Sequence, residues 1–152
     1  MRTEEMIINA GLQVQKPVHE VFEAIVNPAL MSNYFISDGS GRMEEGRELT
    51  WHFPEFPDDV PVRVGRIEKD RYISYYWDVD GREHLSEIHL EPYGEGSTVV
   101  RITERSISGT PDLNWLKGNT EGWANFLACL KAWLEYGVHL RKGAFDFRFA
   151  AE

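Results

Sequence analysis

The longest hydrophobic pattern in the chain lies in residues 119–140, where apolar side chains recur at steps of three and four. This spacing places them on one stripe of a helix. The stripe consists of Trp123, Phe126, Leu127, Leu130, Trp133, Leu134 and Val138. Asn119 or Thr120 is expected to cap the helix and Gly143 to end it. Two tryptophans and a phenylalanine on one stripe need a large apolar partner, which the rest of the chain can supply as a sheet.

The N-terminal part of the chain predicts one strand followed by two short helices. Residues 6–14 form an apolar-rich run typical of a strand, and Pro17 suits the first turn of a helix. Apolar side chains then follow at helical spacing over residues 18–26. Pro28 breaks that helix, and a second short helix is expected over residues 29–34.

The middle of the chain changes to a pattern of short strands separated by turn-forming residues. Strands are expected over residues 48–53, 62–68, 72–78, 84–91 and 98–105. Three prolines between residues 54 and 61 cannot all lie in a central strand, so this segment is predicted to be an exposed loop or a sheet edge. Strands grouped together before one long helix indicate an α+β fold rather than a doubly wound one.

The last two predicted strands align as a hairpin with one apolar and one polar face. The expected pairs on the first face are Leu90–Val100, Ile88–Ile102 and Ser86–Glu104. A register shifted by one residue would mix the two faces. Towards one end this face turns polar, with Ser86, Glu104 and His84. Either the hairpin leaves the core there, or these groups line the mouth of a cavity, where an inward carboxylate needs a partner or a ligand.

Composition narrows the range of partners. The 152 residues fit a single domain, 1–152, and the formal net charge of −9 is repelled by phosphate backbones and anionic membrane faces. Nucleic acid and membrane insertion are therefore not expected. Cys129 is the only cysteine, which leaves no internal disulfide and predicts a small buried side chain. Residues 1–10 carry no apolar leader, so a soluble, cytoplasmic protein is expected.

Neither a metal site nor a catalytic set stands out. The five histidines are not spaced as metal ligands, since His84 and His89 lie an odd number apart on one strand and face opposite sides. Glu87 and His89 share a face and could form an acid–base pair, but a surface charge ladder with Arg101 explains them better. No metal, cofactor or catalytic residue is predicted, and the chain is more consistent with a protein that is not an enzyme.

The remaining signal is an excess of aromatic residues, with five Trp, six Tyr and eight Phe. Core packing accounts for most of them, and the others can line a cavity between sheet and helix that takes a small hydrophobic or amphipathic molecule. The predicted ligand-binding residues are Trp51, Phe53, Tyr75, Trp77, Ser86, Ile88, Glu104, Trp123, Phe126, Leu127 and Leu130.

Short motifs along the chain carry a family resemblance. They are PVHEVFEAI at 17–25, NP at 27–28, YF at 34–35, Gly46, GRIE at 65–68, DRYISYYW at 70–77, STVVRIT at 97–103, EGWANFL at 121–127, LK at 130–131 and LE at 134–135. In order and spacing, over about residues 6–140, the chain resembles the START-related, birch-pollen-allergen-like superfamily (SRPBCC). Within it, the chain is similar to the family related to the C-terminal domain of the activator of the heat-shock-protein-90 ATPase.

This resemblance implies a helix-grip fold, in which a curved antiparallel sheet of six or seven strands wraps around the C-terminal helix and encloses a cavity. Relatives of this kind bind lipids, sterols or polyketides, act as cyclases, or assist a chaperone, and the fold alone does not choose among them. Ligand binding is the leading hypothesis. The alternatives are a cyclase- or hydrolase-type enzyme in the same cavity, and an interaction protein that stimulates a chaperone ATPase, with a role in the stress response.

Two segments depart from the pattern of that family. Residues 54–61, with three prolines and a phenylalanine, look like a particular lid. The tail, residues 143–152, runs past the usual end, with Phe145, Phe147 and Phe149 alternating along it. It could pack back on the body of the protein or on a second copy, as in a homodimer.

Overall fold

The computed structural model describes residues 6–79 and 81–149. In this part of the chain, seven antiparallel strands form one sheet in the order β1-β7-β6-β5-β4-β3-β2. The strands are β1 (Ile8–Val14), β2 (Asp38–Gly39), β3 (Glu48–Phe53), β4 (Phe56–Glu68), β5 (Tyr72–Val79), β6 (Arg82–Tyr93) and β7 (Ser97–Ser106). The helices are α1 (Val18–Val26), α2 (Pro28–Met31), α3 (Leu113–Tyr136) and a short 3-10 helix, η2 (Asp146–Arg148).

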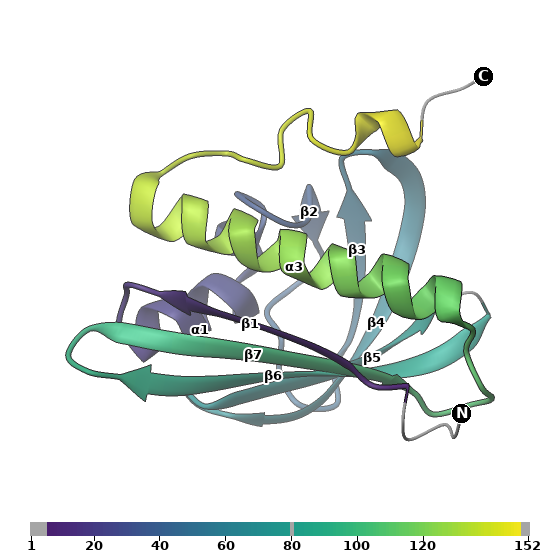
Figure 1. The fold of residues 1–152 in the computed structure, drawn as a ribbon, viewed down its shortest axis with the longest axis horizontal. Helices are drawn as coiled ribbons and strands as arrows, with labels where there is room; N and C mark the ends of the chain where they lie inside the picture. Colours follow the sequence, from purple (N-terminus) through teal and green to yellow (C-terminus); the bar gives the residue numbers. More distant parts are fainter. Residues whose placement is uncertain (1–5, 80, 150–152) are drawn as a thin grey trace.

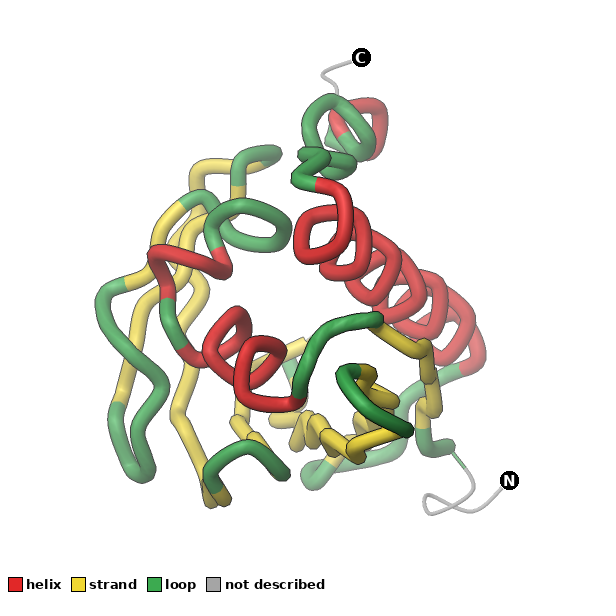
Figure 2. Tube along the Cα trace, turned by 90° about the vertical axis from the view of Figure 1, so that its left-hand side faces the viewer, coloured by secondary structure: helices red, strands yellow, loops and turns green. Residues whose placement is uncertain are grey.

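The sheet curves around α3 (Figure 1), and α1 and α2 lie at one end of its concave side (Figure 2). The core fills the space between this face and the helix, so the predicted α+β helix-grip fold is confirmed. Four residues of the predicted helix stripe are buried there: Trp123, Phe126, Leu127 and Leu130. The β6–β7 hairpin has the predicted register, including Leu90–Val100, Ile88–Ile102 and Ser86–Glu104.

The bounds of α3 differ from the prediction at both ends. The helix begins at Leu113, where the carboxylate of Asp112 accepts a hydrogen bond from the backbone N–H of Trp115 at 2.9 Å. It ends at Tyr136 and is capped by Gly137, whose φ of 64° is the left-handed conformation that favours glycine. Although α3 is long, neither it nor any other described helix is apolar enough over its length to span a membrane.

The segment with the three prolines is a strand rather than a loop over most of its length. A tight turn at residues 54–55 leads into β4, which begins at Phe56 and contains Pro57 and Pro61. The part of β4 before Arg63, which contains both prolines, pairs with β3 only, and pairing with β5 begins at Arg63. The edge of this part that faces away from β3 has no partner strand, so it tolerates prolines, which lack an N–H donor. Similarly, α2 is shorter than expected and ends at Met31.

Candidate functional site

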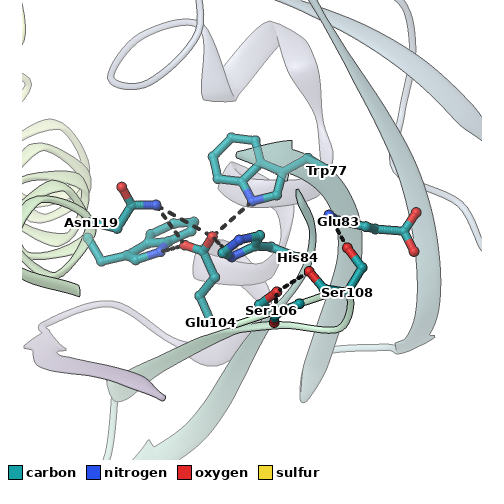
Figure 3. A network of polar contacts seen from close by, with 9 residues as sticks. Trp77, Glu83, His84, Glu104, Ser106, Ser108 and Asn119 are labelled. Carbon is teal, nitrogen blue, oxygen red and sulfur yellow. Dashed lines mark hydrogen bonds and ion pairs between the residues drawn. The ribbon is translucent and has the colours of Figure 1, made fainter. Parts of the chain in front are cut away.

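The carboxylate of Glu104 is the centre of a buried polar cluster between the sheet and α3 (Figure 3). Its side chain is fully buried on the inward face of β7. The indole Nε1 of Trp123 donates a hydrogen bond to Oε1 at 2.6 Å, and that of Trp77 donates to Oε2 at 3.4 Å. The amide of Asn119 lies 3.3 Å from Oε1 and 3.5 Å from Oε2. One carboxylate therefore connects β5, β7 and two turns of α3.

His84 lies against the same carboxylate and is also fully buried. Its Nδ1 is 3.0 Å from Glu104 Oε2, which is an ion-pair distance, although the two atoms are not aligned as a hydrogen bond. The imidazole also packs on the ring of Trp115, with centroids 4.8 Å apart. The hairpin therefore stays in the core at its polar end, so the first of the two alternatives, that it leaves the core there, is wrong.

Two further inward polar groups lie beside this cluster. Tyr75 pairs across the strands with Ser86, and Ser86 pairs with Glu104. Burial, followed by the negative charge of Glu104, raises the pKa of the Tyr75 hydroxyl well above its usual value. Among the described residues, neither this hydroxyl nor that of Ser86 has an aligned hydrogen-bond partner. Tyr75 is therefore neutral at physiological pH.

A cavity of about 190 Å³ adjoins the Glu104 cluster, between the sheet, α3 and the end of the chain. Its walls include Trp77, Asn119 and Trp123, the three side chains that bind the carboxylate. The other lining residues are Phe35, Gly122, Asn125, Arg141, Phe145, Arg148 and Phe149. Two larger hollows of about 480 Å³ are lined by no residue of α3. A third, of about 290 Å³, lies between the first two helices and the later turns of α3, at Trp133 and Leu134. Among these four hollows, the 190 Å³ cavity is the one lined by Asn119 and Trp123, which bind Glu104.

The C-terminal segment, residues 141–149, turns back over α3 (Figure 1). Four of its residues, Arg141, Phe145, Arg148 and Phe149, line the cavity. Arg141 anchors the segment through two hydrogen bonds to Glu55, at 2.7 and 3.0 Å. Further along, the ring of Phe149 packs on that of Phe56 with centroids 5.0 Å apart. Arg148 pairs with Glu121 of α3 at 2.7 Å. Of the two arrangements considered for the tail, the described part packs on the body of the protein.

The predicted ligand-binding residues fall into two groups. Trp77 and Trp123 line the cavity, and Glu104 lies directly behind them. The other eight are core residues that do not line it: Trp51, Phe53, Tyr75, Ser86, Ile88, Phe126, Leu127 and Leu130. Much of the space between sheet and helix is thus filled by the chain's own aromatic rings. Trp51, for example, packs edge-to-face on Tyr75 with centroids 5.2 Å apart.

Sequence reasoning missed the amides and arginines of the cavity. Asn119 was considered only as a cap for α3 and Asn125 only as a residue of its water-facing side, but both line the cavity. The arginines could have been found only by placing the tail, since Arg141 and Arg148 lie far from Trp77 in sequence. Among the described residues, no three His, Cys, Asp or Glu side chains are grouped to hold a metal. Cys129 is buried on α3, and burial raises the pKa of its thiol.

A curved sheet that grips one long helix, with an aromatic cavity beside it, is the architecture of START-related helix-grip proteins. Residues 15–135 match the family described as Activator of Hsp90 ATPase homolog 1-like protein. The chain belongs to this family.

Solved structures with the same fold include proteins of different origin. A Staphylococcus saprophyticus protein is 35% identical, with a TM-score of 0.78, over 89% of this chain and 96% of its own. DynU16, from the dynemicin biosynthetic locus, is 23% identical, with a TM-score of 0.77, over 86% of this chain and 48% of its own. The Aha1 dimer from Colwellia psychrerythraea is 20% identical, with a TM-score of 0.71, over 86% of this chain and 97% of its own. The similarity to the last two structures shows only that the fold is shared. No curated protein matches the chain.

Proposed function

We propose that the protein binds a small hydrophobic or amphipathic molecule in the cavity between the sheet and α3. The observation that carries this proposal is the role of Glu104, which fixes both indoles and the Asn119 amide as cavity walls. Pre-arranged apolar walls with a few oriented polar groups are typical of ligand sites. An engineered apolar cavity of roughly 150 Å³ binds benzene. The 190 Å³ here suits a ligand with one or two rings.

A cyclase or hydrolase in the same cavity has less support. Such an enzyme needs at least two titratable groups that converge on the bound substrate. Glu104 and His84 are close together, but neither lines the cavity, and the carboxylate already accepts hydrogen bonds from three donors. The titratable groups that do line it are Arg141 and Arg148, which are both paired with carboxylates. Arginine stays protonated, so it does not serve as a general acid or base.

An interaction role, as the family's description suggests, is the second candidate. It needs an exposed apolar patch outside the cavity. Tyr136, Val138 and Leu140 are exposed in succession at the end of α3 and just after it. Stimulation of a purified Hsp90 ATPase by the wild-type protein, lost when these three residues are replaced by serine, would favour this role over ligand binding.

The first experiment is native mass spectrometry of freshly purified protein, with organic extraction of any bound molecule. A companion variant is Gly122→Leu, because Gly122 lines the cavity and a Cβ added there meets nothing within 4 Å. Gly118→Leu is the matched control, one turn earlier, equally free of neighbours and outside the cavity lining.

Both substitutions remove a helical glycine and should raise stability by about 0.5–1 kcal/mol. Only Gly122→Leu should lose the co-purifying molecule, or the tryptophan-fluorescence response to a panel of lipids and aromatic compounds. Equal responses in both variants and the wild type would place binding elsewhere. A clean apo mass together with no response from the panel would contradict the proposal.

A further inference from the structure

The charges around the cavity oppose the charge of the whole chain. The protein carries a formal net charge of −9, yet the charged residues that line the cavity are two arginines, Arg141 and Arg148. No aspartate or glutamate is among the described lining residues. Both arginines come from the C-terminal segment, which lies beyond the part of the chain that matches the family, residues 15–135. The body of the fold therefore supplies the aromatic walls, and the segment supplies the cations.

The two arginines differ in how firmly their carboxylate partners hold them. Arg141 forms two hydrogen bonds to Glu55, whose side chain is only 2% exposed, and its guanidinium lies over the rings of Phe35 and Phe53. Arg148 has a single contact to Glu121, whose side chain is 65% exposed. Exposed ion pairs contribute little to stability and exchange readily. Arg148 is therefore the cation that can change partner.

Resting on the proposed function, we propose that the natural ligand is an amphipathic acid. Its apolar body lies against Trp77, Trp123 and Phe149, and its anionic group takes the place of Glu121 on Arg148. A guanidinium matches a carboxylate or phosphate in a two-bond geometry, and such charge-assisted bonds are stronger inside a partly desolvated site. Asn125, which also lines the cavity, can donate a further hydrogen bond from its amide. An anion held in this way would also keep the C-terminal segment over the cavity.

The test compares acids with neutral molecules of the same shape by isothermal titration calorimetry at pH 7 and low salt. The probe pairs are benzoate with benzamide and 1-naphthoate with 1-naphthamide. The acid of at least one pair should bind about tenfold more tightly than its amide, a typical gain for a charge-assisted pair. Added salt should reduce this preference.

Four variants locate the source of the preference. Arg148→Gln should lower the affinity for the acid far more than that for the amide and so abolish the preference. Arg148→Lys should restore part of it. Glu121→Gln should strengthen acid binding because it removes the competing carboxylate. Arg105→Gln is the control: it changes net charge equally, at an exposed position on the outer face of β7.

The outcomes separate this inference from the proposed function. Equal affinity for acid and amide would overturn the inference and leave the binding cavity intact. A preference that survives Arg148→Gln, or a Glu121→Gln variant that binds acids more weakly, would also overturn it. If neither member of either pair binds, and the Gly122→Leu protein behaves like the wild type, both the inference and the proposed function fail.

Discussion

Glu104 shows at the scale of one residue how a buried charge can organise a site. Removing a carboxylate from water is unfavourable unless hydrogen bonds replace the lost solvation. Here the indoles of Trp77 and Trp123 and the amide of Asn119 supply those bonds. In return the carboxylate holds each of these side chains in one orientation. The geometry of the cavity wall therefore depends on an acidic residue that does not itself line the cavity.

Replacing Glu104 with alanine should be severely destabilising, because it leaves the buried Nε1 of Trp123, two partly buried donors and the buried His84 without an acceptor. Breaking a buried charged pair typically costs about 3–5 kcal/mol, and urea unfolding followed by tryptophan fluorescence measures it. Glu104→Gln retains the volume and one acceptor oxygen, so it should cost less. The control is Glu91→Ala on the neighbouring strand, where the ion pair with Arg101 is exposed and should contribute little. Equal effects of the two alanine variants would contradict the role given to Glu104.

His52 gives a second prediction at this scale, at the other end of the sheet. Its Nδ1 lies 2.7 Å from Asp38 and its Nε2 2.5 Å from Asp59, so both nitrogens face carboxylates. The hydrogen bond to Asp38, followed by that to Asp59, raises the pKa of His52 above the usual 6.5.

Because the folded-state pKa is the higher one, the stabilisation by protonated His52 is complete below pH 6.5 and is lost as pH rises through the folded pKa. An NMR titration should show the raised pKa in the wild type and a value nearer 6.5 in the Asp38→Asn/Asp59→Asn double variant. Unfolding free energies of His52→Gln should show a weaker decline over the same pH range. A wild-type pKa at or below 6.5 would exclude this arrangement.

At the scale of the element, the start of α3 depends on a single capping side chain. Asp112 accepts the hydrogen bond from the Trp115 N–H and lies where the helix dipole favours a negative charge. Asp112→Ala should destabilise the protein by about 0.5–2 kcal/mol. Asp112→Asn and Asp112→Ser keep a capping oxygen and should lose much less. Thermal unfolding of the three variants measures the difference, and an equal loss in all three would exclude a capping role.

The same helix shows where sequence patterns fail. Its buried stripe from Trp123 to Leu130 was predicted, because spacing alone determines which side chains share a face. Its first six residues, 113–118, were not, since Gly118 lowers helix propensity and the burial of Trp115 against His84 outweighs it. Pro57 and Pro61 left two alternatives, a loop or a sheet edge. The structure bears out the edge, since both prolines lie in a part of β4 that pairs on one side only.

The site was less predictable than the fold, for a reason that belongs to the whole molecule. Alternation along β6 and β7 placed Ser86 and Glu104 correctly on the inner face, because strand periodicity is local. The cavity, in contrast, exists only where α3, β5 and the C-terminal segment meet. No local pattern indicates that Arg141 will pair with Glu55, 86 positions away. The tail had to be placed in three dimensions before its arginines could be recognised as part of the site.

This arrangement predicts that the C-terminal segment can be removed without loss of the fold. A chain that ends at Lys142 keeps Arg141 and its buried bond to Glu55, while the cavity loses Phe145, Arg148 and Phe149. Far-UV circular dichroism should remain unchanged, whereas the fluorescence of the apolar dye ANS should rise as the indole of Trp77 and the ring of Phe35 become accessible.

A full-length Arg148→Gln/Glu121→Gln protein is the control, since it removes the exposed ion pair but leaves the phenylalanines in place. Its ANS signal should stay close to that of the wild type, because the packing of Phe149 on Phe56 still covers the cavity. If the shortened chain unfolds, the segment is an integral part of the core and not a cover. If it stays folded with no rise in ANS fluorescence, the cavity is already open to solutes of this size, and Phe145 and Phe149 do not control entry to it.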